Sequence, residues 1–196
     1  MARITGISIV LWLLLCGTAE AQFVVDHVEA RQVGHSVRVK VNLDLSLTDA
    51  ADQALSHGVP LIVVNEIELL RRGWLWDHVA QRISERHRLR YYALSGQYVL
   101  DSGADSLNAF RTVSDALKTI SSATASFELP GKPPDKAQRD PPGRSGGYDG
   151  EYVVAVRSRI DINALPAPLR PTALFSPQWQ ISSDWTQWPI SESSTN

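Results

Sequence analysis

The feature that most constrains the fold is a strict alternation of apolar and polar residues between positions 37 and 47. The apolar positions are Val37, Val39, Val41, Leu43, Leu45 and Leu47. Charged or polar side chains occupy every position between them, including Arg38, Lys40, Asn42 and Asp44. Because successive side chains of a strand point to opposite faces, the pattern predicts one strand with a buried face and a wet face.

Most other elements expected along the chain are also strands, at 23–30, 61–70, 79–92, 97–101, 151–162 and 178–189. A helix competes over most of 79–92, but a strand is favoured because it pairs as a hairpin with the acidic strand before it. Short helices are expected at 48–58 and at 113–123, the second capped by Ser114. The run 165–171 should be extended and irregular, since its prolines disrupt helix and ladder alike.

These elements predict a mainly β fold, either an antiparallel sandwich or a partly closed barrel, with two short helices. Residues 22–196 are long enough for one such domain. Apolar residues make up 43% of the chain and charged residues 20%, as in soluble globular proteins. A formal net charge of −2 argues against a nucleic-acid partner, whose recognition needs many uncompensated Lys and Arg side chains.

The first 21 residues have the features of a cleavable signal peptide. Arg3 gives a basic start, residues 7–15 form an apolar core, and Ala19-Glu20-Ala21 offers a cleavage site before Gln22. The core is shorter than the ~20 residues that a spanning helix needs. Lipid attachment at Cys16 is the less favoured alternative. Since Cys16 is the only cysteine, the mature chain would have no thiol and no transmembrane span.

A second unusual segment, 130–150, is rich in proline and glycine. Five prolines and five glycines occupy these 21 positions, and apolar residues are almost absent. Such a segment cannot bury enough surface to offset the entropy cost of ordering it. It is therefore predicted to be a disordered insertion within the domain.

Motifs for catalysis and metal binding are absent from the sequence. It has no G-x-S-x-G, H-E-x-x-H, P-loop or G-x-G-x-x-G pattern. The clusters Asp26-His27-x-Glu29 and Glu85-x-His87 are short and expected to face solvent, so neither a metal nor a cofactor is predicted. The enzymatic alternative is a hydrolase acting on an envelope polymer, with acid and base drawn from carboxylates such as Glu66, Asp77 and Asp184.

The candidate interaction surface consists of six residues: Trp74, Trp76, Trp185, Trp188, Arg86 and Arg88. Tryptophan is enriched at interfaces, so these side chains either line a ligand groove or plug the ends of the fold, and packing is favoured. The arginines of 79–92 either bind an anion or pair with Glu66 and Glu68 on the preceding strand. Cross-strand pairing is the favoured interpretation.

Five segments together resemble a known family. They are 54–61 (ALSHGVPL), 74–77 (WLWD), 89–98 (LRYYALSGQY), 165–169 (LPAPL) and 182–185 (SSDW). In this order they are similar to the exported proteobacterial family called domain of unknown function 4390, over roughly the whole mature chain. The segment 130–150 is longer than is usual there. The resemblance implies a Gram-negative envelope protein with no assigned activity, often encoded beside a membrane sensor kinase and its response regulator.

The function expected from these features is that of a non-enzymatic binding or interaction module in the periplasm, accessory to a membrane sensor kinase. Its partner would be an unidentified envelope protein or a small ligand. Besides the hydrolase, a purely structural subunit of an envelope complex remains an alternative, and it would expose a large apolar patch.

Overall fold

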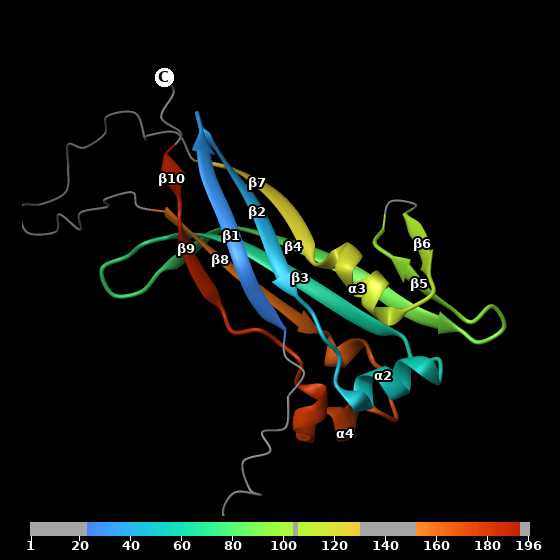
Figure 1. Ribbon diagram of the computed structural model, residues 1–196. Helices are drawn as coiled ribbons and strands as arrows, with labels where there is room; N and C mark the ends of the chain where they lie inside the picture. The colour runs from blue at the N-terminus through green and yellow to red at the C-terminus, as the bar shows by residue number, and fades with distance from the viewer. Residues whose placement is uncertain (1–22, 104–105, 130–151, 193–196) are drawn as a thin grey trace, which may run out of the picture.

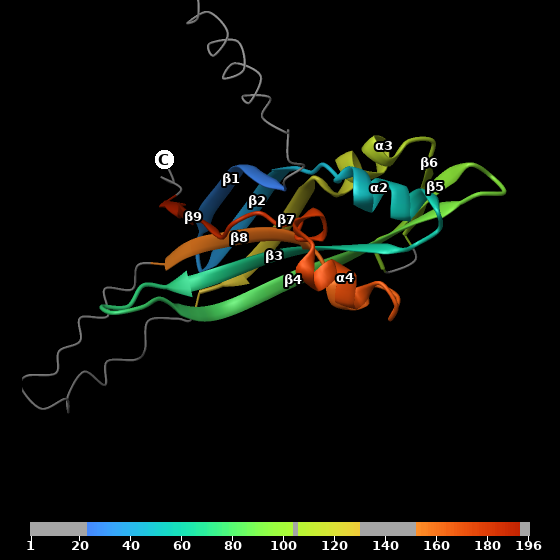
Figure 2. The same ribbon diagram turned by 90° about the horizontal axis from the view of Figure 1, so that it is seen from below.

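A computed structural model describes residues 23–103, 106–129 and 152–192 as two open sheets that pack face to face (Figures 1 and 2). The smaller sheet contains, in order, β10 (Ser191–Glu192), β1 (Val24–Val33), β2 (Ser36–Asp44) and β7 (Ser122–Glu128). The larger contains β6 (Leu107–Phe110), β5 (Gln97–Asp101), β4 (His78–Tyr92), β3 (Leu61–Arg71), β8 (Tyr152–Ile160) and β9 (Thr186–Pro189).

Neighbouring strands are antiparallel except for β1 and β10, which are parallel. The prediction of a mainly β sandwich is confirmed, and neither sheet closes into a barrel within the described residues. The predicted signal peptide and the predicted disordered segment 130–150 lie outside those residues. No helix of the described structure has the length and apolar character needed to cross a membrane.

The core lies between the two sheets, and β2 supplies its central apolar stripe. Val37, Val39 and Val41 are almost fully buried, as the alternation predicts. The ladder ends at Asp44, but Leu45 is still buried and only Leu47 is partly exposed. The alternating residues facing solvent are exposed, which confirms the predicted orientation of the strand.

One buried polar network crosses this core. The Asn65 Nδ2 on β3 donates to the Ile120 carbonyl at 3.2 Å, and its Oδ1 accepts from the Ser158 hydroxyl at 2.7 Å. The Ser183 hydroxyl in turn accepts from the Ser158 backbone N–H at 2.9 Å. Since Asn65, Ser158 and Ser183 are all buried, these bonds replace the water that the groups lose on folding.

Two of the helices match the expected short helices. The first, α2 (Asp49–Ser56), begins where the Thr48 hydroxyl accepts from the Ala51 N–H, and its buried face holds Ala51 and Leu55. The second, α3 (Val113–Ile120), is capped by Thr112 instead of the expected Ser114. It is also shorter than expected, because the chain turns at Ser121 into β7.

Several predicted elements need correction. Residues 165–171 do not remain irregular throughout, because Arg170 begins α4 (Arg170–Phe175). Pro171 lies in the first turn of that helix, where the missing N–H removes no helical hydrogen bond. The expected strand 178–189 shrinks to β9, and Trp179 lies in a 3-10 turn in which its own side chain is buried. The sequence did not predict β6 or β7.

The hairpin of β3 and β4 extends beyond the rest of the larger sheet. The strand assignment for 79–92 is confirmed, since β4 is a 15-residue strand paired with β3 from Leu61 to Arg71. A register shift between Leu69 and Leu70 marks an irregularity near the turn. The turn that joins the two strands projects past the ends of the neighbouring strands (Figures 1 and 2).

Candidate functional site

The projecting turn between β3 and β4 exposes three large apolar side chains in succession, here called the apolar tip. Trp74 is 98% exposed, Leu75 66% and Trp76 64%. The favoured expectation that these tryptophans pack inside the fold is therefore wrong for Trp74 and Trp76. Burying such side chains against a partner would remove a large apolar area from water, which is what stabilises most protein associations.

The apolar tip has a defined shape because Gly73 closes the turn. A Cβ built on Gly73 would lie 2.2 Å from the Trp76 carbonyl oxygen, so only glycine allows this approach. At the other end of the turn, Asp77 Oδ2 accepts from Gln187 Nε2 of β9 at 3.3 Å. Gly73 and Asp77 thus make these contacts at the two ends of the turn that carries the tryptophans.

The other two candidate tryptophans lie on opposite sides of the larger sheet. Trp185 is partly exposed on the outer face, where the Arg157 guanidinium carbon lies 4.7 Å from the centroid of its ring. Trp188 is half-buried, packs against the core and meets His27 edge-on at 5.7 Å between ring centroids. Trp185 and Trp188 thus make contacts within the fold, and neither side chain is part of the apolar tip.

The arginines of β4 lie on the outer face of the larger sheet, where carboxylates neutralise two of them. Arg82 pairs with buried Glu68, and Arg86 lies 3.8 Å from buried Asp161. Arg88 is exposed and lies opposite Asp101 of β5. The favoured interpretation, pairing with Glu66 and Glu68 on the preceding strand, is therefore confirmed for Arg82 and Glu68, whereas Arg86 meets a carboxylate from beyond β8.

Glu66 departs from that expectation, because its partners come from β8 instead of β4. The Arg157 side chain binds Glu66 Oε2 at 2.7 Å, and Arg159 binds the same oxygen at 3.3 Å. Burial raises the pKa of Glu66, but the hydrogen bond and charge of Arg157, together with those of Arg159, outweigh it and leave the pKa below 4.5. A general acid needs the opposite shift, so Glu66 is unsuited to that role in the hydrolase alternative.

This pKa shift predicts how Glu66 contributes to stability. A carboxyl whose pKa is lowered on folding stabilises the protein above its unfolded pKa, and that contribution is lost as pH falls through the folded value. Glu66→Gln should therefore lower the melting temperature at pH 7, and the difference from wild type should shrink below about pH 4.5. Melts across this pH range test it. A difference that stays constant with pH would mean that the ion pairs contribute nothing.

The two histidine clusters differ in burial. His27 lies 3.8 Å from Glu29 and both are exposed, as expected. The His87 side chain is only 11% exposed, and its Nδ1 lies 2.9 Å from the Ser102 hydroxyl, so the expectation that it faces solvent is wrong. Within the part of the chain that the structure describes, no three metal-binding side chains gather at one place.

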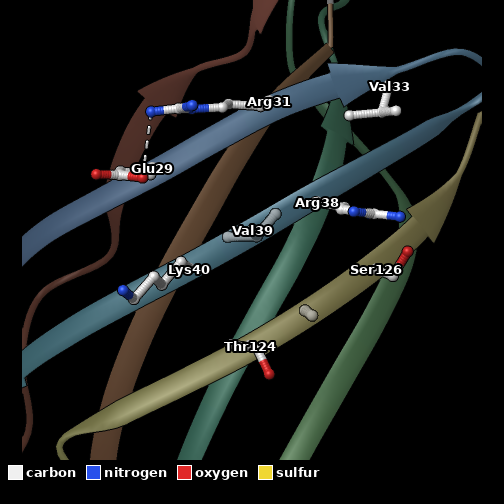
Figure 3. Close-up of a pocket in the computed structure, with 9 residues that line it drawn as sticks. Glu29, Arg31, Val33, Arg38, Val39, Lys40, Thr124 and Ser126 are labelled. Atoms are coloured by element: carbon white, nitrogen blue, oxygen red, sulfur yellow. Dashed lines mark ion pairs between the residues drawn. The ribbon is translucent and has the colours of Figure 1, made fainter.

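A shallow basin of about 650 Å³ lies on the outer face of the smaller sheet (Figure 3). We call it the sheet basin. Its lining comes from β1, β2 and β7: Glu29, Arg31, Val33, Arg38, Val39, Lys40, Thr124, Ala125 and Ser126. From the sequence, Arg38 and Lys40 were expected only to form the wet face of β2. The sheet basin could not be predicted from the sequence, because β7, the third strand that lines it, was not predicted.

Comparison with known proteins gives one match. The family model described as Domain of unknown function (DUF4390) matches residues 20–189, which is most of the chain. No curated protein and no solved structure matches the chain.

Proposed function

Since the chain belongs to the family described as Domain of unknown function (DUF4390), we propose that it is a non-enzymatic binding module of the Gram-negative periplasm. It attaches to the membrane surface through the apolar tip and acts there as an accessory to a membrane sensor kinase. The observation that carries the proposal is the exposure of Trp74, Leu75 and Trp76 together on one projecting turn.

The exposed side chains of the apolar tip should have a lower free energy at a lipid bilayer surface than in water. Tryptophan is amphipathic and favours the membrane–water interface, where its ring meets acyl chains and its N–H meets polar headgroups. The turn projects past the neighbouring strands, so it can enter a fluid bilayer without a matching cavity in a partner. Leu75, between the two tryptophans, adds apolar area to the same insertion.

Charge beside the apolar tip favours anionic lipid. Arg72 is exposed and lies two residues before Trp74. A basic side chain near an anionic bilayer surface contributes about 1 kcal/mol to binding. Arg72 would thus meet the headgroups while the neighbouring tryptophans enter the interface.

Binding to lipid vesicles tests this function. The purified exported protein should sediment with vesicles of phosphatidylcholine and phosphatidylglycerol. Leu75→Ser should lower the partition coefficient about tenfold, because burying a leucine side chain contributes roughly 1.5–3 kcal/mol. Arg72→Gln should weaken binding to these vesicles but not to vesicles of phosphatidylcholine alone.

The matched control is Leu94→Ser. Leu94 is even more exposed than Leu75, but it lies at the turn between β4 and β5, at the other end of β4. This substitution should leave vesicle binding unchanged. If it weakens binding as much as Leu75→Ser, or if the wild-type protein stays in the supernatant, the apolar tip is not a membrane attachment site.

A further inference from the structure

The sheet basin places like charges side by side. In the register of β1 and β2, Arg31 lies directly opposite Arg38, with Lys40 two residues along on the same face. Like charges directly opposed across an antiparallel pair destabilise a sheet. In Figure 3 the three cationic side chains lie on the outer face, where Arg31 extends toward Glu29 and Arg38 extends the opposite way, toward Ser126.

Among the described residues, the lining holds less negative than positive charge. Glu29 is the only carboxylate among these lining residues; it lies opposite Lys40 in the register of β1 and β2 and 3.5 Å from Arg31. Within the described residues, neither Arg38 nor Lys40 has an ion pair. The outer face of the larger sheet is different, since Arg82 and Arg157 there each meet a buried glutamate.

Hydroxyl donors complete the lining. Ser126 lies opposite Arg38 in the register of β2 and β7, and Thr124 lies opposite Lys40. Both side chains are exposed. Each row across the sheet therefore presents a cation beside a hydroxyl, which are the groups that bind phosphate oxygens through charge-assisted hydrogen bonds.

We propose that the sheet basin binds a small soluble molecule through its phosphate group. The described lining residues include three cations and one carboxylate, a formal charge of +2, which a phosphate monoester of about −1.5 to −2 would balance at pH 7. A volume of about 650 Å³ lies within the roughly 300–1,000 Å³ that small-molecule sites occupy. The arginine fork and the hydroxyls of β7 fix the phosphate, and the open side of the basin admits the rest of the molecule.

Titration with inorganic phosphate, followed by NMR of the backbone amides at low salt, tests this site. Shifts should saturate and concentrate on β1, β2 and β7. Binding should strengthen as the pH rises through the second pKa of inorganic phosphate, because the ion then takes its second negative charge. Arg38→Gln should weaken phosphate binding about tenfold, because it removes a charge-assisted donor.

Arg90→Gln is the matched control, since it removes an exposed arginine from a strand of the larger sheet. It should leave phosphate binding unchanged, and Arg38→Gln should leave vesicle binding unchanged. Arg38→Gln should not lower the melting temperature, because Arg38 is exposed and makes no ion pair with any described residue. The proposal is overturned if phosphate gives no saturable shifts, if Arg90→Gln weakens binding equally, or if Arg38→Gln weakens vesicle binding instead.

Discussion

Val41→Asp is expected to unfold the domain. Val41 is fully buried in the middle of β2, between Val28 of β1 and Ala123 of β7. A carboxylate there would have no partner, and its burial costs several kcal/mol against a total stability of about 5–15 kcal/mol. No disulfide within the chain can compensate, because Cys16 is its only cysteine.

Asn42→Asp, one residue along, introduces the same carboxylate on the opposite face of β2. Asn42 is exposed, so this change should alter stability by less than about 1 kcal/mol. Thermal melts of the two purified variants decide the matter. If they melt at the same temperature, the orientation of β2 and the sandwich built on it are wrong.

Asn65→Leu is the second substitution with a large expected effect. It would remove the partner of the Ile120 carbonyl and of the Ser158 hydroxyl, both on the core side of β3. Each buried group left unsatisfied costs about 1–3 kcal/mol. The free energy of unfolding should therefore fall by roughly 2–5 kcal/mol. Because Ile120 is the last residue of α3, the change should also loosen that helix from the larger sheet.

Urea unfolding measures this loss. Asn108→Leu is the control, since Asn108 is exposed on β6 and should lose less than about 1 kcal/mol. Combining Asn65→Leu with Ser158→Ala should cost less than the sum of the single changes, because the two side chains bind each other. A loss for Asn65→Leu no larger than that for Asn108→Leu would show that the network does not stabilise the core.

The fold could be predicted where side-chain periodicity is strong and local. The stripe from Val37 to Leu45 alternates strictly, and its burial follows the pattern. β7 also alternates, but its inward residues are Ala123, Ala125 and Phe127, whose small alanines gave little apolar signal. At α4, the prolines of 165–171 predict an irregular segment, but Pro171 lies in the first turn of the helix, where proline is tolerated.

The candidate site was harder to predict, because exposure depends on contacts between distant segments. Packing was favoured for both Trp74 and Trp185, yet Trp74 projects from a turn into solvent while the ring of Trp185 is covered by Arg157. The sequence suggested that Glu66 pairs with the strand that follows it, whereas its arginines come from β8, about 90 residues later. Strand order, which the sequence does not reveal, determines both outcomes.

The most direct measurement of membrane attachment is quenching of tryptophan fluorescence by lipids brominated along their acyl chains. With anionic vesicles, the wild-type protein should be quenched, because Trp74 and Trp76 would reach the acyl region. The double variant Trp74→Ser/Trp76→Ser should lose most of that quenching, while Leu94→Ser should keep it. Equal quenching of the wild type and the double variant, or none in either, would contradict attachment through the apolar tip.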